Sequence, residues 1–185
     1  MNYHDGSRRL QERFDSRRLA DRLAERLSRS AFTAEDKAFI ESRHMFFLAT
    51  ADASGRPDCS YKGGLPGFVR VTGSSELSFP SYDGNGMFRS LGNLVVNPHV
   101  GLLFLDFEHP RRLRVNGRAR LEDPTGEFEG AQLTVRVRAD AIFPNCPRYI
   151  HRLQLVEASV YVPRSGYEPP EPGWKQNFRD VLPRD

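Results

Sequence analysis

Polar side chains that could bind an anion gather in one stretch of the sequence, residues 81–98. Turn residues at 83–86 open it, and an apolar pattern with helical spacing follows until a proline stops the helix. Arg89, Ser90 and Asn93 lie on or near the first turn of this predicted helix. Free backbone N–H groups and the positive end of the helix dipole meet there, which favours phosphate. The alternative is an ordinary link between two strands, with solvated polar side chains.

A second group of polar residues lies in the predicted strand 56–62. Ser60 and Lys62 alternate across Tyr61, so their side chains point to the same face of the strand. Gly63 and a second glycine follow directly. A hydroxyl and an ammonium group beside accessible backbone could hold a phosphate, although a solvent-facing strand end explains the pattern equally well.

The elements that must position these residues are mostly short strands. Hairpin turns join the early ones, and the run 112–121 alternates cleanly between an apolar and a polar row. The spacing is too short for parallel βαβ units. The pattern favours a mainly β fold, a small antiparallel barrel of about six strands with helices at its ends. Such a barrel encloses little space, so a sizeable ligand would bind outside it, in a groove or at a dimer interface.

The chain divides into three parts. Residues 1–31 are rich in arginine and predict helices that pack on the barrel or on a second subunit, with a membrane-surface helix as the weaker alternative. Residues 32–162 hold the barrel, and Thr33 with Asp36 predicts a capped helix at its start. The tail 163–185 is rich in proline and glycine, and we expect it to dock through Trp174, the only tryptophan of the chain.

Composition excludes several function classes. Lys and Arg total 27 against 24 Asp and Glu, and the two signs are interleaved, which argues against nucleic acid as a partner. No apolar run is long enough to cross a membrane, and the charged N-terminus does not read as a secretory signal, so we expect a cytoplasmic protein without membrane contact. The two cysteines and five histidines show no metal-binding spacing, and we expect no metal site.

Several runs of the sequence, taken in order, resemble the pyridoxamine 5′-phosphate oxidase-like flavoproteins. They are residues 47–57, 60–71, 84–85, 90–98, 100–105 and 113–119. Residues 145–150 look like the uncharacterised flavin-nucleotide-binding branch of that family. The resemblance covers about 46–121 and implies a split β-barrel homodimer with FMN in a groove between the subunits.

The resemblance also implies roles for individual residues. Positions that hold the FMN phosphate correspond to Ser60, Lys62, Gly63, Arg89, Ser90 and Asn93. Positions near the ribityl chain or the isoalloxazine ring correspond to Tyr82, Asn85 and Arg112. Weaker candidates, from the partner subunit or the C-terminal tail, are Arg148, Trp174 and Lys175.

Two departures from the family limit the functional prediction. The true oxidases carry an Arg-Lys pair where this chain has Arg89-Ser90, and their substrate-binding region has no clear counterpart after Pro163. We therefore expect an FMN-dependent oxidoreductase of unknown substrate, or else a non-catalytic flavin carrier or redox sensor. Related barrels bind deazaflavin or haem, but neither His99 nor His151 is convincingly placed as a haem ligand.

Two further hypotheses have less support. The arginines of residues 1–31 could bind nucleic acid or an anionic membrane, which predicts steeply salt-dependent binding. Cys146 could act as a nucleophile, but the sequence identifies no base beside it.

Overall fold

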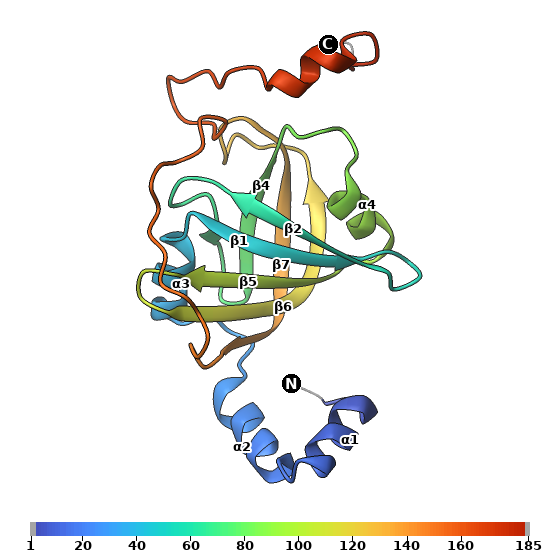
Figure 1. Cartoon of the computed structure of the whole chain (residues 1–185), viewed down its shortest axis with the longest axis vertical. Helices are drawn as coiled ribbons and strands as arrows, with labels where there is room; N and C mark the ends of the chain where they lie inside the picture. The colour runs from blue at the N-terminus through green and yellow to red at the C-terminus, as the bar shows by residue number, and fades with distance from the viewer. Residues whose placement is uncertain (1–2, 184–185) are drawn as a thin grey trace.

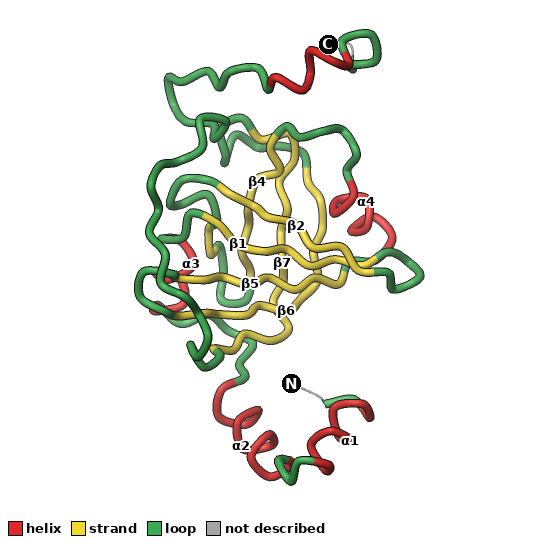
Figure 2. The backbone as a smooth tube through the Cα atoms, viewed as in Figure 1, coloured by secondary structure: helices red, strands yellow, loops and turns green. Residues whose placement is uncertain are grey.

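The structure, a computed structural model, describes residues 3–183, so the first two residues of the 1–31 extension and the last two of the 163–185 tail lie outside it. One antiparallel sheet dominates it (Figures 1 and 2). The helices are α1 (Asp5–Arg13), α2 (Arg17–Leu27), α3 (Ala34–Glu41), α4 (Arg89–Val96) and the 3₁₀ helix η1 (Gly173–Phe178). The strands are β1 (Met45–Ala51), β2 (Pro57–Gly63), β3 (Arg70–Val71), β4 (Glu76–Tyr82), β5 (His99–Asp106), β6 (Arg111–Glu122) and β7 (Ala131–Pro144).

The sheet has the order β2-β1-β5-β6-β7-β4-β3. The prediction of a mainly β, antiparallel fold with flanking helices is confirmed, but the sheet described here has seven strands rather than six. The shortest of the seven is β3, a two-residue ladder in which Arg70 and Val71 pair with β4. The sheet is open, since its end strands β2 and β3 are not paired with each other.

Local sequence signals explain several of these elements. In β6 the predicted inner row is buried, with Leu113 at 2% and Val115 at 0% exposure, because alternation places one side of the strand on the core. The predicted cap of α3 is confirmed as a capping box, in which Thr33 Oγ1 accepts from Asp36 N at 3.1 Å and Asp36 Oδ2 accepts from Thr33 N at 3.0 Å. The link between β6 and β7, which includes Glu127, consists of bends and a turn.

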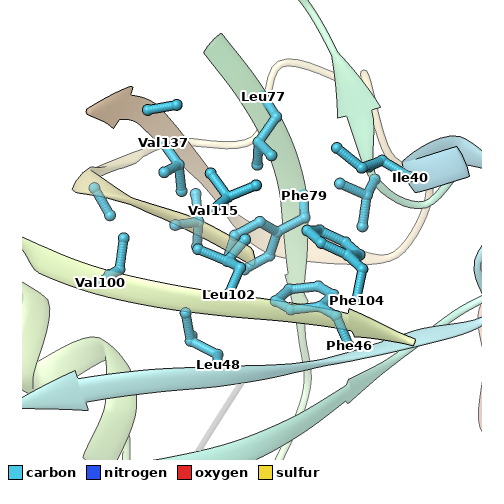
Figure 3. Packing of buried hydrophobic residues seen from close by; sticks show 14 of the residues in the cluster. Ile40, Phe46, Leu48, Leu77, Phe79, Val100, Leu102, Phe104, Val115 and Val137 are labelled. Atoms are coloured by element: carbon cyan, nitrogen blue, oxygen red, sulfur yellow. The ribbon is translucent and has the colours of Figure 1, made fainter. Parts of the chain in front are cut away.

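The core lies on the concave side of the sheet, where large apolar side chains from distant strands meet (Figure 3). Phe46 packs its ring against Phe79 at 4.9 Å and Phe104 at 5.1 Å between centroids. Helix α3 contributes Ile40, which is fully buried. Burial of each such side chain contributes about 2 kcal/mol, so the central strands form a stable platform for groups at the sheet edges.

The two ends of the chain extend away from this core. Helices α1 and α2 project from one end of the molecule as an arm (Figure 1), and their apolar residues Leu10, Phe14 and Leu23 are 57%, 70% and 44% exposed. The base of the arm is fixed, because Arg29 exchanges two backbone hydrogen bonds with Ile142 of β7. After β7 the chain runs along one side of the sheet and ends in η1 (Figure 1). No helix within residues 3–183 has the length and apolar character needed to cross a membrane.

Candidate functional site

Helix α4 lies next to strands β1 and β2 at one edge of the sheet (Figure 1). In the loop before it, φ is positive at Gly86 (+73°), which glycine adopts freely, and also at Phe88 (+46°), the N-cap of α4, where a left-handed conformation is unfavourable for a bulky side chain. Asn93, one of the predicted phosphate ligands, donates to Thr50 Oγ1 at 3.0 Å. Because Thr50 is buried, this bond fixes the helix to β1, and it gives Asn93 a structural role in the protomer.

The start of α4 meets the polar face of β2 and forms a cluster of side chains that we call the β2–α4 cluster: Asp58, Ser60, Lys62, Arg89 and Ser90. Ser90 Oγ donates to Asp58 Oδ2 at 2.8 Å and lies 3.0 Å from Ser60 Oγ. Arg89 Nε lies 3.5 Å from Asp58 Oδ1. Arg89 and Ser90, two of the residues predicted to bind phosphate, therefore contact one carboxylate, and Ser60 is linked to it through Ser90.

Lys62 is half-buried at this edge of the sheet. Burial lowers the pKa of its ammonium group, and the negative charge of Asp58 opposes that change. Among residues 3–183 its Nζ has no hydrogen bond and no salt bridge within 4.0 Å. Arg89, whose side chain is 71% exposed, also keeps most of its guanidinium accessible. Both cations of the cluster can thus contact a ligand from solvent.

A second basic cluster lies on the outer face of the sheet, and we call it the outer cluster: Arg112, Arg114, Asn145, Cys146 and Arg148. Arg114 donates to Asn145 Oδ1 at 2.6 Å. The Nε of Arg112 is buried without a hydrogen-bond partner among the described residues. Hydrogen bonds from the backbone and then the side chain of Arg148 lower the pKa of the exposed Cys146 thiol.

The arginines in the predicted polar row of β6 differ in whether a nearby carboxylate compensates their charge. Arg120 is paired with Glu76 at 3.2 Å and Glu122 at 2.8 Å, so its charge is already compensated. Arg112 and Arg114 have no salt bridge among residues 3–183. Arg118, farther along the row, lies 3.8 Å from Asp140. The end of the row that belongs to the outer cluster is therefore the part without a carboxylate partner among the described residues.

A sequence profile described as pyridoxamine 5′-phosphate oxidase matches residues 32–160. The chain belongs to the pyridoxamine 5′-phosphate oxidase-like family. The profile spans the whole sheet and both clusters, from the cap of α3 to the segment after β7. No curated protein has a significant sequence match to this chain.

Solved structures share the fold of this family member. The HupZ protein of Group A Streptococcus is 19% identical with a TM-score of 0.50, and the match covers 66% of this chain and 99% of that one. A candidate pyridoxamine 5′-phosphate oxidase of Lactobacillus delbrueckii is 20% identical with a TM-score of 0.50, over 62% of this chain and 95% of that one. HutZ of Vibrio cholerae, described as a haem storage protein, is 20% identical with a TM-score of 0.45, over 60% and 92%.

Three residues implied by the family resemblance lie apart from the β2–α4 cluster. A side chain at Gly63 would meet the ring of Tyr61, so this glycine makes room for an aromatic ring on the outer face. Tyr82 is half-buried at the end of β4, where burial raises the pKa of its hydroxyl. Asn85 is exposed and accepts a hydrogen bond from Met87 N at 3.1 Å, which shapes the turn before α4.

Of the two candidates in the C-terminal tail, Lys175 contacts the segment before α4. Lys175 Nζ lies 2.7 Å from Asp83 Oδ2, so the tail docks beside the entrance to α4. The ring of Trp174 lies tilted by 59° against that of Phe178, with centroids 6.2 Å apart, and Trp174 is 39% exposed. The tail thus reaches the neighbourhood of the site through an ion pair, whereas the sequence analysis expected the tryptophan to be the anchor.

The sequence analysis missed Asp58, although its position carried a signal. Asp58 alternates with Ser60 and Lys62 on one face of β2, so the same period that selected those two residues also selects the carboxylate. Within residues 3–183, no group of three or more His, Cys, Asp or Glu side chains is arranged to hold a metal ion.

Proposed function

We propose that this protein is an FMN-binding flavoprotein, and that the β2–α4 cluster holds the phosphate of the cofactor. The observation that carries the proposal is the convergence of Ser60 and Lys62 from β2 with Arg89 and Ser90 from α4. Two hydroxyls, two cations and the start of a helix form a donor set suited to a phosphate monoester. The family resemblance assigns the same positions to the phosphate.

The residues present fit a phosphate in charge and in accessibility. Lys62 has no partner within hydrogen-bond distance among the described residues, and Arg89 makes only a loose 3.5 Å contact. A ligand phosphate could therefore form charge-assisted hydrogen bonds that the protein alone leaves unmade. Asn93 would act indirectly, because it holds α4 against β1.

We propose further that the functional unit is a homodimer with one FMN site at each end of the interface. The two clusters lie on opposite faces of the sheet, so one protomer does not bring both to one ligand. A second copy could place its outer cluster over the flavin, and Arg112 Nε is buried there without an acceptor. Exposed apolar residues of the arm and of the outer face, such as Tyr61 at 62%, provide surface for such an interface.

The reaction class that fits this arrangement is oxidation or reduction of a small molecule. FMN, when bound, would supply the two-electron chemistry, and the protein would bind and orient it. The residues of this chain would fix the phosphate at β2–α4 and place positive charge near the ring through Arg112 or Arg148. A non-catalytic flavin carrier would need the same phosphate site, and turnover with NAD(P)H and oxygen separates the two.

The test is the visible spectrum of purified protein after addition of FMN and desalting. We expect a retained flavin band in the wild type, loss of most of it in Arg89→Ala and Lys62→Ala, and full retention in the control Arg56→Ala, whose side chain is 84% exposed in the β1–β2 turn. Riboflavin, which lacks the phosphate, should bind weakly to all four proteins. A protein that never retains FMN would refute the proposal.

The same spectrum addresses the alternatives. All five histidines are exposed, so the protomer offers no buried axial ligand for haem. A Soret band from the purified protein would nevertheless show that the cofactor is haem. Retention of deazaflavin in place of FMN would show that the cofactor is deazaflavin. We expect the protein in the cytoplasm, where its two free cysteines stay reduced.

A further inference from the structure

We propose that Asp58 acts as an internal substitute for the ligand phosphate: it accepts the Ser90 hydroxyl hydrogen and forms a loose ion pair with Arg89 until an anion displaces it. This inference rests on the proposed phosphate site and assigns that site a residue that limits its affinity. The carboxylate accepts from Ser90 Oγ at 2.8 Å and pairs with Arg89 Nε at 3.5 Å. Its side chain is 19% exposed, so it lies within the cluster rather than beside it.

The hydrogen-bond directions support this assignment. The Ser90 hydroxyl has one hydrogen, and it is directed to Asp58 Oδ2. The hydrogen at the 3.0 Å contact between the two hydroxyls then comes from Ser60. The two hydroxyls thus form a chain in which Ser60 donates to Ser90 and Ser90 donates to the carboxylate. A phosphate oxygen that binds between them must take over the same donors, because each hydroxyl has only one hydrogen to give.

Charge gives the second argument. With Asp58 ionised, the cluster of Asp58, Lys62 and Arg89 carries one net positive charge, whereas without it the cluster carries two. A phosphate entering the site meets a carboxylate of its own sign. The carboxylate also stabilises the partly buried ammonium of Lys62 when no ligand is bound. Asp58 therefore stabilises the free protein and weakens the binding of phosphate, which makes the site suited to an exchangeable ligand rather than a permanently held one.

The test compares Asp58→Asn with wild type for three probes: FMN, riboflavin and inorganic phosphate. Removal of one charge about 6 Å from a phosphate, at an effective dielectric constant of about 40, changes affinity about tenfold. We expect FMN and inorganic phosphate to bind about tenfold more tightly, with riboflavin unchanged. The control Asp140→Asn removes a charge from an exposed carboxylate that lies 3.8 Å from Arg118, and we expect less than a twofold effect.

Binding of FMN and riboflavin is followed by flavin fluorescence, and that of inorganic phosphate by amide NMR shifts at residues 89–91. Asp58→Ser replaces the asparagine variant if the latter does not fold. Equal or weaker phosphate binding in the variant, or an equal gain for riboflavin, overturns the inference and leaves FMN binding standing. Tighter inorganic phosphate binding in a protein that binds no flavin supports the role of Asp58 and removes the flavin proposal. Absence of phosphate binding in every variant overturns it as well.

Discussion

Replacement of Lys62 by methionine should change stability and ligand binding in opposite directions. Lys62 is half-buried on β2, its Cα is paired in register with that of Phe46, and burial lowers the pKa of its ammonium. The folded protein therefore disfavours the charged form of this side chain. Methionine keeps an unbranched apolar chain but removes the charge, so the desolvation cost disappears while the packing is retained.

The expected gain in the free energy of unfolding is about 1 kcal/mol. A buried polar group without a hydrogen bond costs about 1–3 kcal/mol in proteins, and we take the lower end because Lys62 is only half-buried and is partly compensated by Asp58. The effect depends on pH with a defined sign. The folded-state pKa of Lys62 lies below 10.5, so the cost is fully present below that folded pKa and decreases as pH rises toward 10.5. The stability difference between variant and wild type should decrease over the same range.

Binding should change in the opposite sense. Loss of one charge-assisted hydrogen bond to phosphate costs about 1.5–3 kcal/mol, so Lys62→Met should bind FMN about 10–100-fold more weakly and bind riboflavin as the wild type does. Urea unfolding at pH 7 and pH 10, together with fluorescence titration of both flavins, measures the two effects. Arg56→Met is the control, since its side chain is 84% exposed, and it should change neither quantity.

Two results would contradict this reasoning. If Lys62→Met unfolds more easily than the wild type at pH 7, the lysine is part of the structural framework and its burial is compensated by interactions that the geometry does not reveal. If the ratio of FMN to riboflavin affinity is unchanged, Lys62 does not contact the phosphate and the β2–α4 cluster is not the phosphate site.

Three further predictions follow from other parts of the molecule. Asp36→Ala should lower the free energy of unfolding by about 2–3 kcal/mol in urea melts at pH 7, because it removes a 1%-exposed carboxylate that closes the α3 cap and pairs with Arg29. Burial raises the pKa of Asp36, but the hydrogen bonds from Arg29 and Thr33 and the charge of Arg29 together outweigh burial and lower that pKa below its usual value. The loss should therefore shrink as pH falls through the lowered pKa. Arg148→Met should slow the alkylation of Cys146 by iodoacetamide at pH 7 roughly threefold, because Arg148 lowers the pKa of this thiol. Peptide mass spectrometry measures the rate, with Cys59 as internal reference. An unchanged rate would show that Arg148 does not stabilise the thiolate. Leu23→Glu, at a position 44% exposed on the arm, should raise the dissociation constant of the proposed homodimer more than tenfold, as measured by light scattering, without lowering the melting temperature of the monomer. Identical masses for variant and wild type would exclude the arm from the interface.

Local chemistry made much of the fold predictable. The alternation of β6 and the capping box of α3 rest on interactions between residues close in sequence, and both form as expected. The number of strands was not predictable in the same way. The sequence of residues 68–71 favours a strand, but β3 has only two residues, because its pairing with β4 extends no further.

The candidate site shows the same division. The sequence alone identified two groups of phosphate-binding side chains, at Ser60 with Lys62 and at Arg89 with Ser90, because period and helix position are local properties. Only the tertiary structure decided that the two groups meet, with their serine hydroxyls 3.0 Å apart, since the packing of α4 on β1 and β2 is a long-range contact set by burial of the helix face. It also decided that Asp58 contacts Ser90 and Arg89. A carboxylate in an anion site is electrostatically unfavourable unless hydroxyl donors and cations lie beside it, and only the fold places them there. Single charges become a site only when folding fixes their distances, and Coulomb energies depend on those distances.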